Sequence, residues 1–286
     1  MAVTNSREGL HGRIFTDQML ASKNGMKFSM NITPRNIVVM PALHRPEMAA
    51  LALERIRSTP EAGSLDVRIF VDHSTEAVLD DFEYVRDEYF PEATIYHAGE
   101  HIYAPSGCWN ILNALKAGYE SGAEYIFLIE EDIMTYPDYF TWNFAQSGDH
   151  FATCGRFIRA HFSDYYTNPG ACFRSEKLKL VIPHICDDYF AFRRDYLNRV
   201  FPPVMDDASD LDDGLIRRVI RSVNGHVLYP GTPKVAHQGF HYYNKLVQYK
   251  IEGSISERIE SARNLLARVQ SADRYSHDFE PLHLVQ

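Results

Sequence analysis

The sequence predicts an α/β protein with a mostly parallel central sheet and helices on both faces of that sheet. Between residues 36 and 129, short apolar runs alternate with amphipathic segments of helical length, which is the pattern of consecutive strand–helix–strand units. The apolar runs are continuous, which is typical of strands buried on both faces of a parallel sheet. In such sheets, ligands bind beyond the carboxyl ends of the strands.

The regular part of the pattern consists of four strands separated by three helices. We expect strands over 36–40, 66–72, 93–99 and 125–129. Apolar residues recur at helical spacing over 46–58, 76–90 and 107–122. Pro46 suits the first turn of its helix, and Gly122 suits the position just past the end of another.

The second half of the chain is less regular. Segments 150–158 and 189–197 have the character of strand and strand-to-helix pieces, and 226–230 predicts a short strand. Helical patterns follow at 212–225, ended by Asn-Gly, and at 254–270, which begins with a serine cap. No repeat or linker divides the chain, so we expect a single domain over 34–286, preceded by an arm over 1–33.

Composition and charge narrow the class of protein. The 286 residues are 45 % hydrophobic and 23 % charged, as in an ordinary globular protein. The formal net charge of −9 argues against a broad basic face for nucleic acid, although a local basic groove remains compatible with it. The four cysteines form no C-x-x-C pair, and we find neither a signal-peptide pattern nor a long apolar run. We expect a cytoplasmic protein with reduced thiols and no membrane partner.

Polar side chains gather where the predicted parallel strands end. The stretch YIFLIEEDIMTYPDYF runs from an apolar strand directly into three carboxylates. The residues expected at this edge are Arg45, Asp72, His73, Glu130, Glu131 and Asp132. Carboxylate oxygens are suitable ligands for Mg²⁺ or Mn²⁺, usually together with substrate phosphates. A solvated loop that happens to be acidic is the alternative interpretation.

Three segments in order resemble the GT-A glycosyltransferases, a Rossmann-like fold, and most closely the N-acetylglucosaminyltransferase I group. LIEEDIMTYPDYFTW is similar to the DXD-type strand end of that family, LDDGLIRR to its Asp-Asp segment, and PKVAHQGFHYYNKL to its C-terminal V-x-H-x-x-x-F segment. The resemblance covers roughly residues 36 to 250. It implies a nucleotide-binding half at about 34–140 and an acceptor half at about 141–250, with a C-terminal helix at about 254–270.

The resemblance implies a role for each residue of the acidic strand end. Asp132 matches the last acid of the motif, which binds the metal directly. Glu131 stands at the middle position, where the resembled group has Asp, and Glu130 matches the first acid, which helps to shape the site. Asp72 matches the position that recognises uracil, and Arg45 matches a nucleotide contact. Ordinary loop polarity is the alternative for Asp72 and Arg45.

The later segments supply the expected base, a second metal ligand and the acceptor side. Asp212 and Asp213 match the segment that carries the catalytic base, and we prefer Asp212. Both also lie at a predicted helix start, where acids are common caps. His237 matches a C-terminal metal ligand, with His241 as a weaker competitor, and a structural histidine is the alternative. The resemblance places a further pair on the acceptor side, Asp188 and Tyr189.

These expectations together predict a metal-dependent glycosyltransferase of the hexosyl or N-acetylhexosaminyl type. It would use Mn²⁺ or Mg²⁺ and move a sugar from a nucleotide diphosphate sugar, preferably a UDP-sugar, to an acceptor hydroxyl with inversion. The acceptor would be a glycan, a protein or a hydroxymethylated DNA base. Arginines that would touch DNA phosphates, or would simply face solvent, are Arg193, Arg194, Arg217, Arg218 and Arg221.

Two other classes of function remain open at this point. A nucleotidyltransferase also combines a parallel sheet with an acidic metal site, but it usually has a glycine-rich loop after the first strand, and MPALHRP contains no glycine. A non-catalytic nucleotide-sugar-binding module would need neither Asp212 nor His237. Calorimetry with UDP followed by a hydrolysis assay separates binding from turnover.

Overall fold

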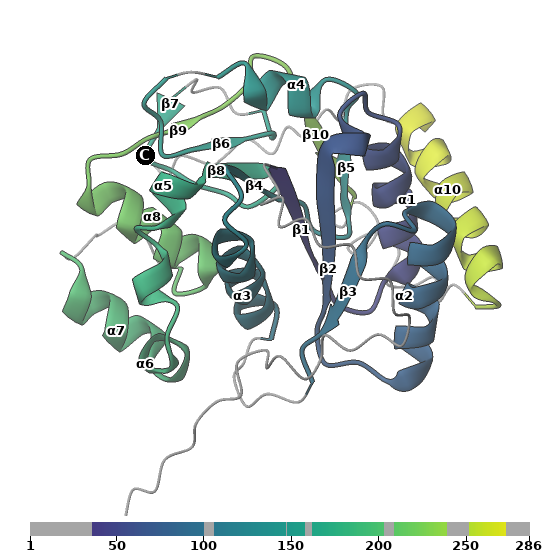
Figure 1. The fold of residues 1–286 in the computed structure, drawn as a ribbon, viewed down its shortest axis with the longest axis horizontal. Helices are drawn as coiled ribbons and strands as arrows, with labels where there is room; N and C mark the ends of the chain where they lie inside the picture. Colours follow the sequence, from purple (N-terminus) through teal and green to yellow (C-terminus); the bar gives the residue numbers. More distant parts are fainter. Residues whose placement is uncertain are drawn as a thin grey trace, which may run out of the picture.

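The computed structural model describes six segments of the chain, namely residues 36–99, 106–146, 148–157, 162–202, 209–238 and 252–272. The expected arm at 1–33 and His241 lie outside these residues. An eight-stranded sheet forms the centre of the molecule, with the strand order β3-β2-β1-β4-β8-β6-β9-β7 (Figure 1).

The four strands of the first half are parallel, as predicted. They are β1 (Asn36–Ala42), β2 (Leu65–Val71), β3 (Thr94–His97) and β4 (Tyr125–Leu128). Strand β1 lies between β2 and β4, with Ala42 opposite Val71 and Val39 opposite Leu128. The α/β class with a mostly parallel central sheet is therefore confirmed.

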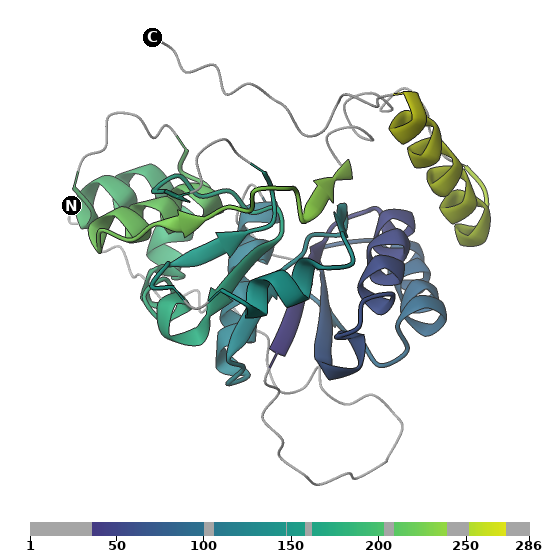
Figure 2. The same ribbon diagram turned by 90° about the horizontal axis from the view of Figure 1, so that it is seen from above.

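Helices cover both faces of the parallel strands (Figures 1 and 2). Helix α3 (Ser106–Glu120) packs with Ile37 and Val39 in one core. The opposite core holds Val38 and Met40 beneath three helices, α1 (Pro46–Arg57), α2 (Glu76–Tyr89) and α10 (Ile255–Ala272). Successive residues of β1 point to opposite faces, and both faces are buried, which explains why the strand reads as a continuous apolar run.

The second half extends the sheet with short strands of both directions. Strand β8 (Ala171–Arg174) runs antiparallel to β4, and β6 (Ala152–Cys154) runs antiparallel to β8. Strand β9 (Val227–Leu228) is parallel to β6, and β7 (Phe162–Ser163) forms the edge. Strands were expected within 150–158 and 226–230, and β6 and β9 lie there; β8 was not expected.

Short helices surround this second half. They are α4 (Tyr139–Phe144), α5 (Ser175–Leu178), α6 (Asp187–Ala191), α7 (Arg193–Val200) and α8 (Asp212–Ser222), with 3₁₀ turns at Ala62–Ser64 and Ile182–His184. The strand character expected over 189–197 is wrong, because this segment forms α6 and α7. Its buried Tyr189, Phe190, Tyr196 and Leu197 pack on a helical surface instead of a sheet.

A second, two-stranded sheet connects distant parts of the chain. Strand β5 (Ile133–Thr135) directly follows the acidic cluster, and β10 (Val235–His237) pairs with it in antiparallel orientation. The backbone N–H of Gln238 also donates to the carbonyl of Asp132 at 2.9 Å. Sequence periodicity does not reveal three-residue strands, so this pairing was not expected.

The predicted ends of the last two helices are present. Asn224 has a φ of 52° after α8, and Gly225 N–H donates to the Ile220 carbonyl at 2.8 Å, which closes the helix. Before α10, Ser254 and Glu257 form reciprocal hydrogen bonds. Within the described residues, no helix has the length and hydropathy needed to cross a bilayer.

Candidate functional site

The carboxyl ends of β2, β1 and β4 lie side by side and hold the acidic cluster at one edge of the sheet. Asp72 N–H donates to the carbonyl of Ala42 at 2.9 Å, just past the end of β2. Glu131 N–H donates to the carbonyl of Pro41 at 3.3 Å, just past the end of β4. Backbone hydrogen bonds thus continue the sheet register into the loops and bring residues from three segments to this edge.

Arg45 binds two of the three carboxylates. Its Nε and Nη2 both donate to Oε1 of Glu131, at 3.0 and 2.7 Å, and Nη2 lies 3.0 Å from Oδ2 of Asp132. Burial lowers the pKa of Arg45, but the charges of Glu131 and Asp132 outweigh burial and raise it. Arg45 therefore stays charged and balances the buried carboxylates.

His237 reaches the acidic cluster from β10, a strand of the second half of the chain. The pairing of β10 with β5 places His237 opposite Ile133, and its Nε2 lies 3.4 Å from Oδ2 of Asp132. Burial acts to raise the pKa of Asp132, but the hydrogen bond and charge of His237, together with Arg45, lower it. Asp132 and His237, which the sequence places far apart, form one site.

The donor set at Asp132 is compatible with a divalent cation that shares its shell with substrate. Oδ1 of Asp132 is buried and has no hydrogen-bond partner within the described chain, although buried polar atoms are normally paired. A carboxylate and an imidazole are acceptable ligands for Mn²⁺. In the segments that the structure describes, no three His, Cys, Asp or Glu side chains converge as a metal-binding group. Asp132 and His237 are the two side chains here that could serve as metal ligands.

Glu130 is the first carboxylate of the acidic cluster, and the charges of both Asp132 and Asp212 act on it. Burial, followed by the charges of Asp132, Asp212 and Glu131, raises its pKa well above the ordinary value. The charges of Asp132 and Asp212 thus both favour the protonated form of Glu130. Part of Glu130 remains exposed, unlike Glu131 and Asp132, which are 4 % exposed.

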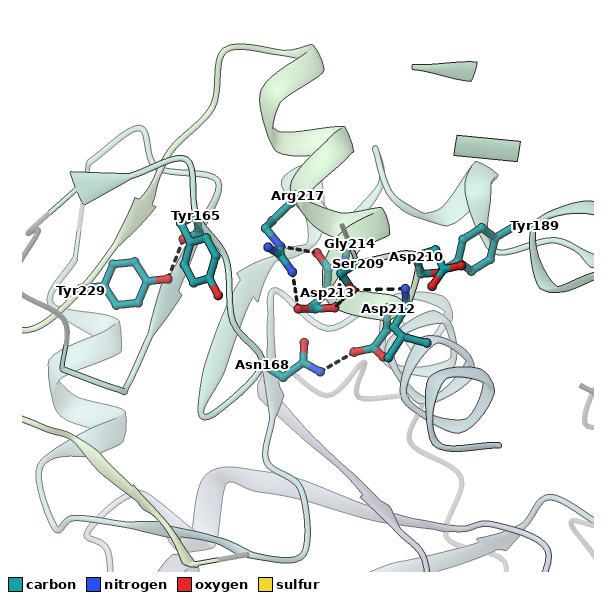
Figure 3. Close-up of polar contacts among 11 residues, drawn as sticks. Tyr165, Asn168, Tyr189, Ser209, Asp210, Asp212, Asp213, Gly214, Arg217 and Tyr229 are labelled. Atoms are coloured by element: carbon teal, nitrogen blue, oxygen red, sulfur yellow. Dashed lines mark hydrogen bonds and ion pairs between the residues drawn. The ribbon is translucent and has the colours of Figure 1, made fainter. Parts of the chain in front are cut away.

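Asp212 is the first residue of α8, and 5 % of it is exposed. Its Oδ2 accepts a hydrogen bond from the side-chain amide of Asn168 (Figure 3). Burial raises the pKa of Asp212 to about 6, against the opposing hydrogen bonds from Asn168 and from the backbone of Asp212 and Asp213. A carboxylate that titrates near neutral pH is a suitable general base.

Asp213 caps the first turn of the helix instead. Its Oδ1 accepts hydrogen bonds from Ser209 Oγ at 2.7 Å and from the Gly214 N–H at 2.8 Å. Its Oδ2 forms an ion pair with Arg217, one turn later (Figure 3). Asp213 is thus bound by groups in and just before the first turn of α8, whereas Asp212 accepts from Asn168, and Asp212 stays the preferred candidate for the base.

The acceptor-side pair does not converge on a ligand surface. Tyr189 is fully buried, and its hydroxyl donates to the carbonyl of Asp210 at 3.0 Å. Tyr189 has no exposed surface in this structure, and its expected role on the acceptor side stays a prediction. Asp188 is exposed and pairs with Arg199 on the adjacent helix.

Asp72 and the arginines of α8 are also engaged by the protein. Asp72 is 1 % exposed, and its Oδ1 accepts the backbone N–H of His73 at 2.8 Å. On α8, Arg217 lies over the ring of Tyr165 at 4.8 Å, Arg218 donates to the carbonyl of Pro202, and Arg221 pairs with Asp164. These contacts weaken the interpretation of α8 as a surface for DNA phosphates.

Asn168 and Tyr166 belong to the site but carry no motif. Asn168 opens an Asn-Pro-Gly run, a turn signal without chemical meaning. Tyr166 is fully buried, and its hydroxyl has no hydrogen-bond partner in the described segments. Burial and then the charges of Cys154, Asp212, Glu130 and Asp213 raise its pKa.

Comparisons with known proteins give distant structural neighbours. The chain matches no protein-family model and no curated protein sequence. The galactosyltransferase LgtC, solved with donor and acceptor sugar analogues, aligns at 11 % identity over 78 % of this chain and 82 % of its own, with a TM-score of 0.45. Staphylococcus aureus TarS 1–349 aligns at 13 % identity over 87 % and 76 %, with a TM-score of 0.45.

A third neighbour is a mannosyltransferase. PcManGT of Pyrobaculum calidifontis, solved with GDP-Man and Mn²⁺, aligns at 14 % identity over 85 % of this chain and 76 % of its own, with a TM-score of 0.43. Two of these three neighbours are named as sugar transferases, and none of the three carries the assignment of a function to this chain. That assignment depends on the site.

Proposed function

We propose that this protein is a metal-dependent glycosyltransferase that moves a sugar from a nucleotide diphosphate sugar to a hydroxyl group. The observation that carries the proposal is the pairing of β5 with β10, which brings His237 to 3.4 Å from Asp132 at the ligand edge of a parallel sheet. Motif resemblance at both residues supports the same interpretation.

In this proposal, Arg45, Asp132 and His237 receive the diphosphate end of the donor. Asp132 and His237 would hold Mn²⁺ or Mg²⁺, and imidazole favours Mn²⁺. The ion would act as a Lewis acid that neutralises charge on the leaving diphosphate. Arg45, which remains charged, lies beside this position and is suited to a phosphate oxygen.

Asp212 acts as the general base in the proposed reaction. The acceptor hydroxyl oxygen attacks the anomeric carbon, and its proton passes to the Asp212 carboxylate. A new carbon–oxygen bond forms as the bond from the anomeric carbon to the phosphate oxygen breaks, and the nucleoside diphosphate leaves with the electron pair. A base that acts on the side opposite the leaving group implies inversion.

We propose a UDP-sugar of the hexosyl or N-acetylhexosaminyl type as the donor, with Asp72 at the base and Glu130 and Glu131 near the sugar and ribose. A glycan or protein hydroxyl is the favoured acceptor. A hydroxymethylated DNA base is less favoured, because the arginines Arg217, Arg218 and Arg221 all contact protein groups.

The decisive experiment is a hydrolysis screen with UDP-glucose, UDP-galactose, UDP-N-acetylglucosamine and GDP-mannose. We expect release of the nucleoside diphosphate with Mn²⁺ and none after addition of EDTA. Calorimetry with UDP, with and without Mn²⁺, provides a second measurement of the same site. Tight UDP binding without turnover of any donor or transfer to any acceptor would indicate a binding module instead of an enzyme.

A further inference from the structure

Asn168 makes a contact that its local turn does not need. At the first position of a turn, an Asn side chain commonly bonds the backbone two residues later. Here the side-chain Nδ2 of Asn168 donates instead to Oδ2 of Asp212, 44 residues along the chain (Figure 3). Its Oδ1 is buried and has no hydrogen-bond partner within the described segments. The side chain therefore serves Asp212 and not its own loop.

The backbone around Asn168 is held independently of that side chain. Ala171 N–H donates to the Asn168 carbonyl at 2.9 Å, and Gly170 between them has a φ of 62°, as in a type II turn. The hydroxyl of Tyr139 donates to the Gly170 carbonyl at 3.1 Å. A β-carbon on Gly170 would come within 2.6 Å of Val235, so the turn packs against the strand that carries His237.

The segment before the turn is attached to α8. Tyr229 Oη donates to the Tyr165 carbonyl at 2.6 Å, while Arg217 of α8 lies over the Tyr165 ring (Figure 3). Arg217 also pairs with Asp213, next to Asp212. The positions of Asn168 and Asp212 are therefore coupled through a second set of contacts, and the amide has a defined geometry toward the carboxylate.

We propose that Asn168 is a positioning residue for the general base Asp212, whose carboxylate it holds in the orientation that receives the acceptor proton. This inference rests on the proposed function. The Tyr166 hydroxyl is also buried and without a hydrogen-bond partner in the described chain, and the charge of Asp212 acts on it.

Three substitutions test the positioning role. Asn168→Asp keeps the shape, removes the donor and adds a like charge, whereas Asn168→Ala removes the whole amide without adding a charge. Asn143→Asp is the matched control, since Asn143 is a buried asparagine whose Nδ2 donates to the Tyr139 carbonyl at 2.8 Å, away from α8. Thermal unfolding of each variant shows the cost to the fold.

The measurement is steady-state hydrolysis from pH 5 to 9 with Mn²⁺, using whichever of UDP-glucose, UDP-galactose, UDP-N-acetylglucosamine and GDP-mannose the wild type hydrolyses fastest. We expect kcat to fall about 10–100-fold in Asn168→Asp and less in Asn168→Ala, a part of what general bases contribute. The KM for donor should change less than about threefold, because Asn168 acts on the base and not on donor binding.

The acid limb of the pH–rate profile distinguishes positioning from general damage. Loss of an N–H donor, or a new like charge, favours the protonated form of Asp212, so the limb should move to higher pH. Apart from the new carboxyl group in Asn168→Asp, the titratable groups that face Asp212 are the same in all variants. They are Cys108, Glu130, Tyr166, Tyr189 and Asp213.

Every outcome of these measurements either supports or overturns the positioning role of Asn168. A lower kcat with a shifted limb in the Asn168 variants, absent from Asn143→Asp, supports positioning. An unchanged kcat and limb overturns it, as does an equal loss of kcat and donor affinity that follows the loss of thermal stability. A wild-type chain that turns over no donor overturns the proposed function itself, and the positioning role with it.

Discussion

The parallel half of the fold, with β1 to β4, and the mixed half, with β5 to β10, differ in how their strands are specified. Strands β1 and β2 have seven residues each and are parallel; β1 is buried on both faces, and β2 is buried except for the half-buried Asp66 and Arg68. Strands β5 and β10 have three residues each and pair only with each other in the described chain. The first half owes its structure to local patterns, whereas the second half depends on contacts between distant segments.

The candidate site combines residues from both halves of the fold. The parallel half supplies Arg45 and the acidic strand end, which are visible in the sequence as polar residues after apolar runs. The mixed half supplies His237, Asp212 and Asn168, whose positions follow from tertiary pairing. If the site is a composite, changes in either half should affect the same step.

The largest effect is expected for Asp132→Ala. Turnover should fall about 1,000-fold or more, because the carboxylate proposed to hold the metal is lost, as in other sites where a charge-stabilising group is removed. His237→Ala should act on the same step from the mixed half. The double variant should be little worse than Asp132→Ala alone, since the two residues act as a unit.

The control for Asp132→Ala is Asp138→Ala. Asp138 belongs to the same motif, but it is exposed and pairs with Lys234, so we expect near-normal turnover. Full addition of the two single effects in the double variant would contradict a composite site. Normal, Mn²⁺-dependent transfer by Asp132→Ala would remove the assignment.

Asp212→Asn should lower kcat about 100–1,000-fold, because the amide cannot accept the acceptor proton. Calorimetry should show that UDP still binds with Mn²⁺, since the diphosphate position at Arg45, Asp132 and His237 is untouched. Asp213→Asn is the neighbouring comparison; it should mainly weaken the first turn of α8 and its pairing with Arg217. Equal kinetic losses in both variants would argue against Asp212 as the sole base.

The free energy of unfolding of Asp212→Asn, compared with that of the wild type, should increase as the pH rises. Burial raises the pKa of Asp212 from 3.8 to about 6, so the wild type loses stability as the pH rises through that range. Asn carries no such penalty. The variant should gain up to about 3 kcal/mol relative to wild type between pH 4 and 8, which denaturant titrations at several pH values would measure. A pH-independent difference would contradict the raised pKa.

A pair of glycines compares the two halves directly. Gly170→Ala places a β-carbon 2.6 Å from Val235 at a φ of 62°, and we expect a loss of about 2–3 kcal/mol. Because Val235 belongs to β10, activity should fall as well. Gly118→Ala on α3 meets Ile126 at 2.8 Å, but better helix propensity offsets about 1 kcal/mol of that crowding.

Denaturant unfolding and donor hydrolysis should be measured on both glycine variants. Gly118→Ala should change stability slightly and leave turnover per folded molecule unchanged. Equal losses of turnover in the two variants would show that the site does not depend specially on the mixed half.

The sequence alone determined the parallel half of this protein. The apolar runs that became β1, β2 and β4, and the 3.6-residue spacing that became α1, α2 and α3, are local properties of the chain. The same reasoning placed Glu130, Glu131 and Asp132 at a ligand edge, because parallel strands end together.

Only the tertiary structure decided how the second half completes the site. The strands β5, β8 and β10 contain too few residues for a clear periodic signal, and their stability comes from partners elsewhere in the chain. The same holds for the position of His237 beside Asp132 and for the contact of Asn168 with Asp212. Each is selected by a contact across the fold, and such contacts leave no pattern in neighbouring residues.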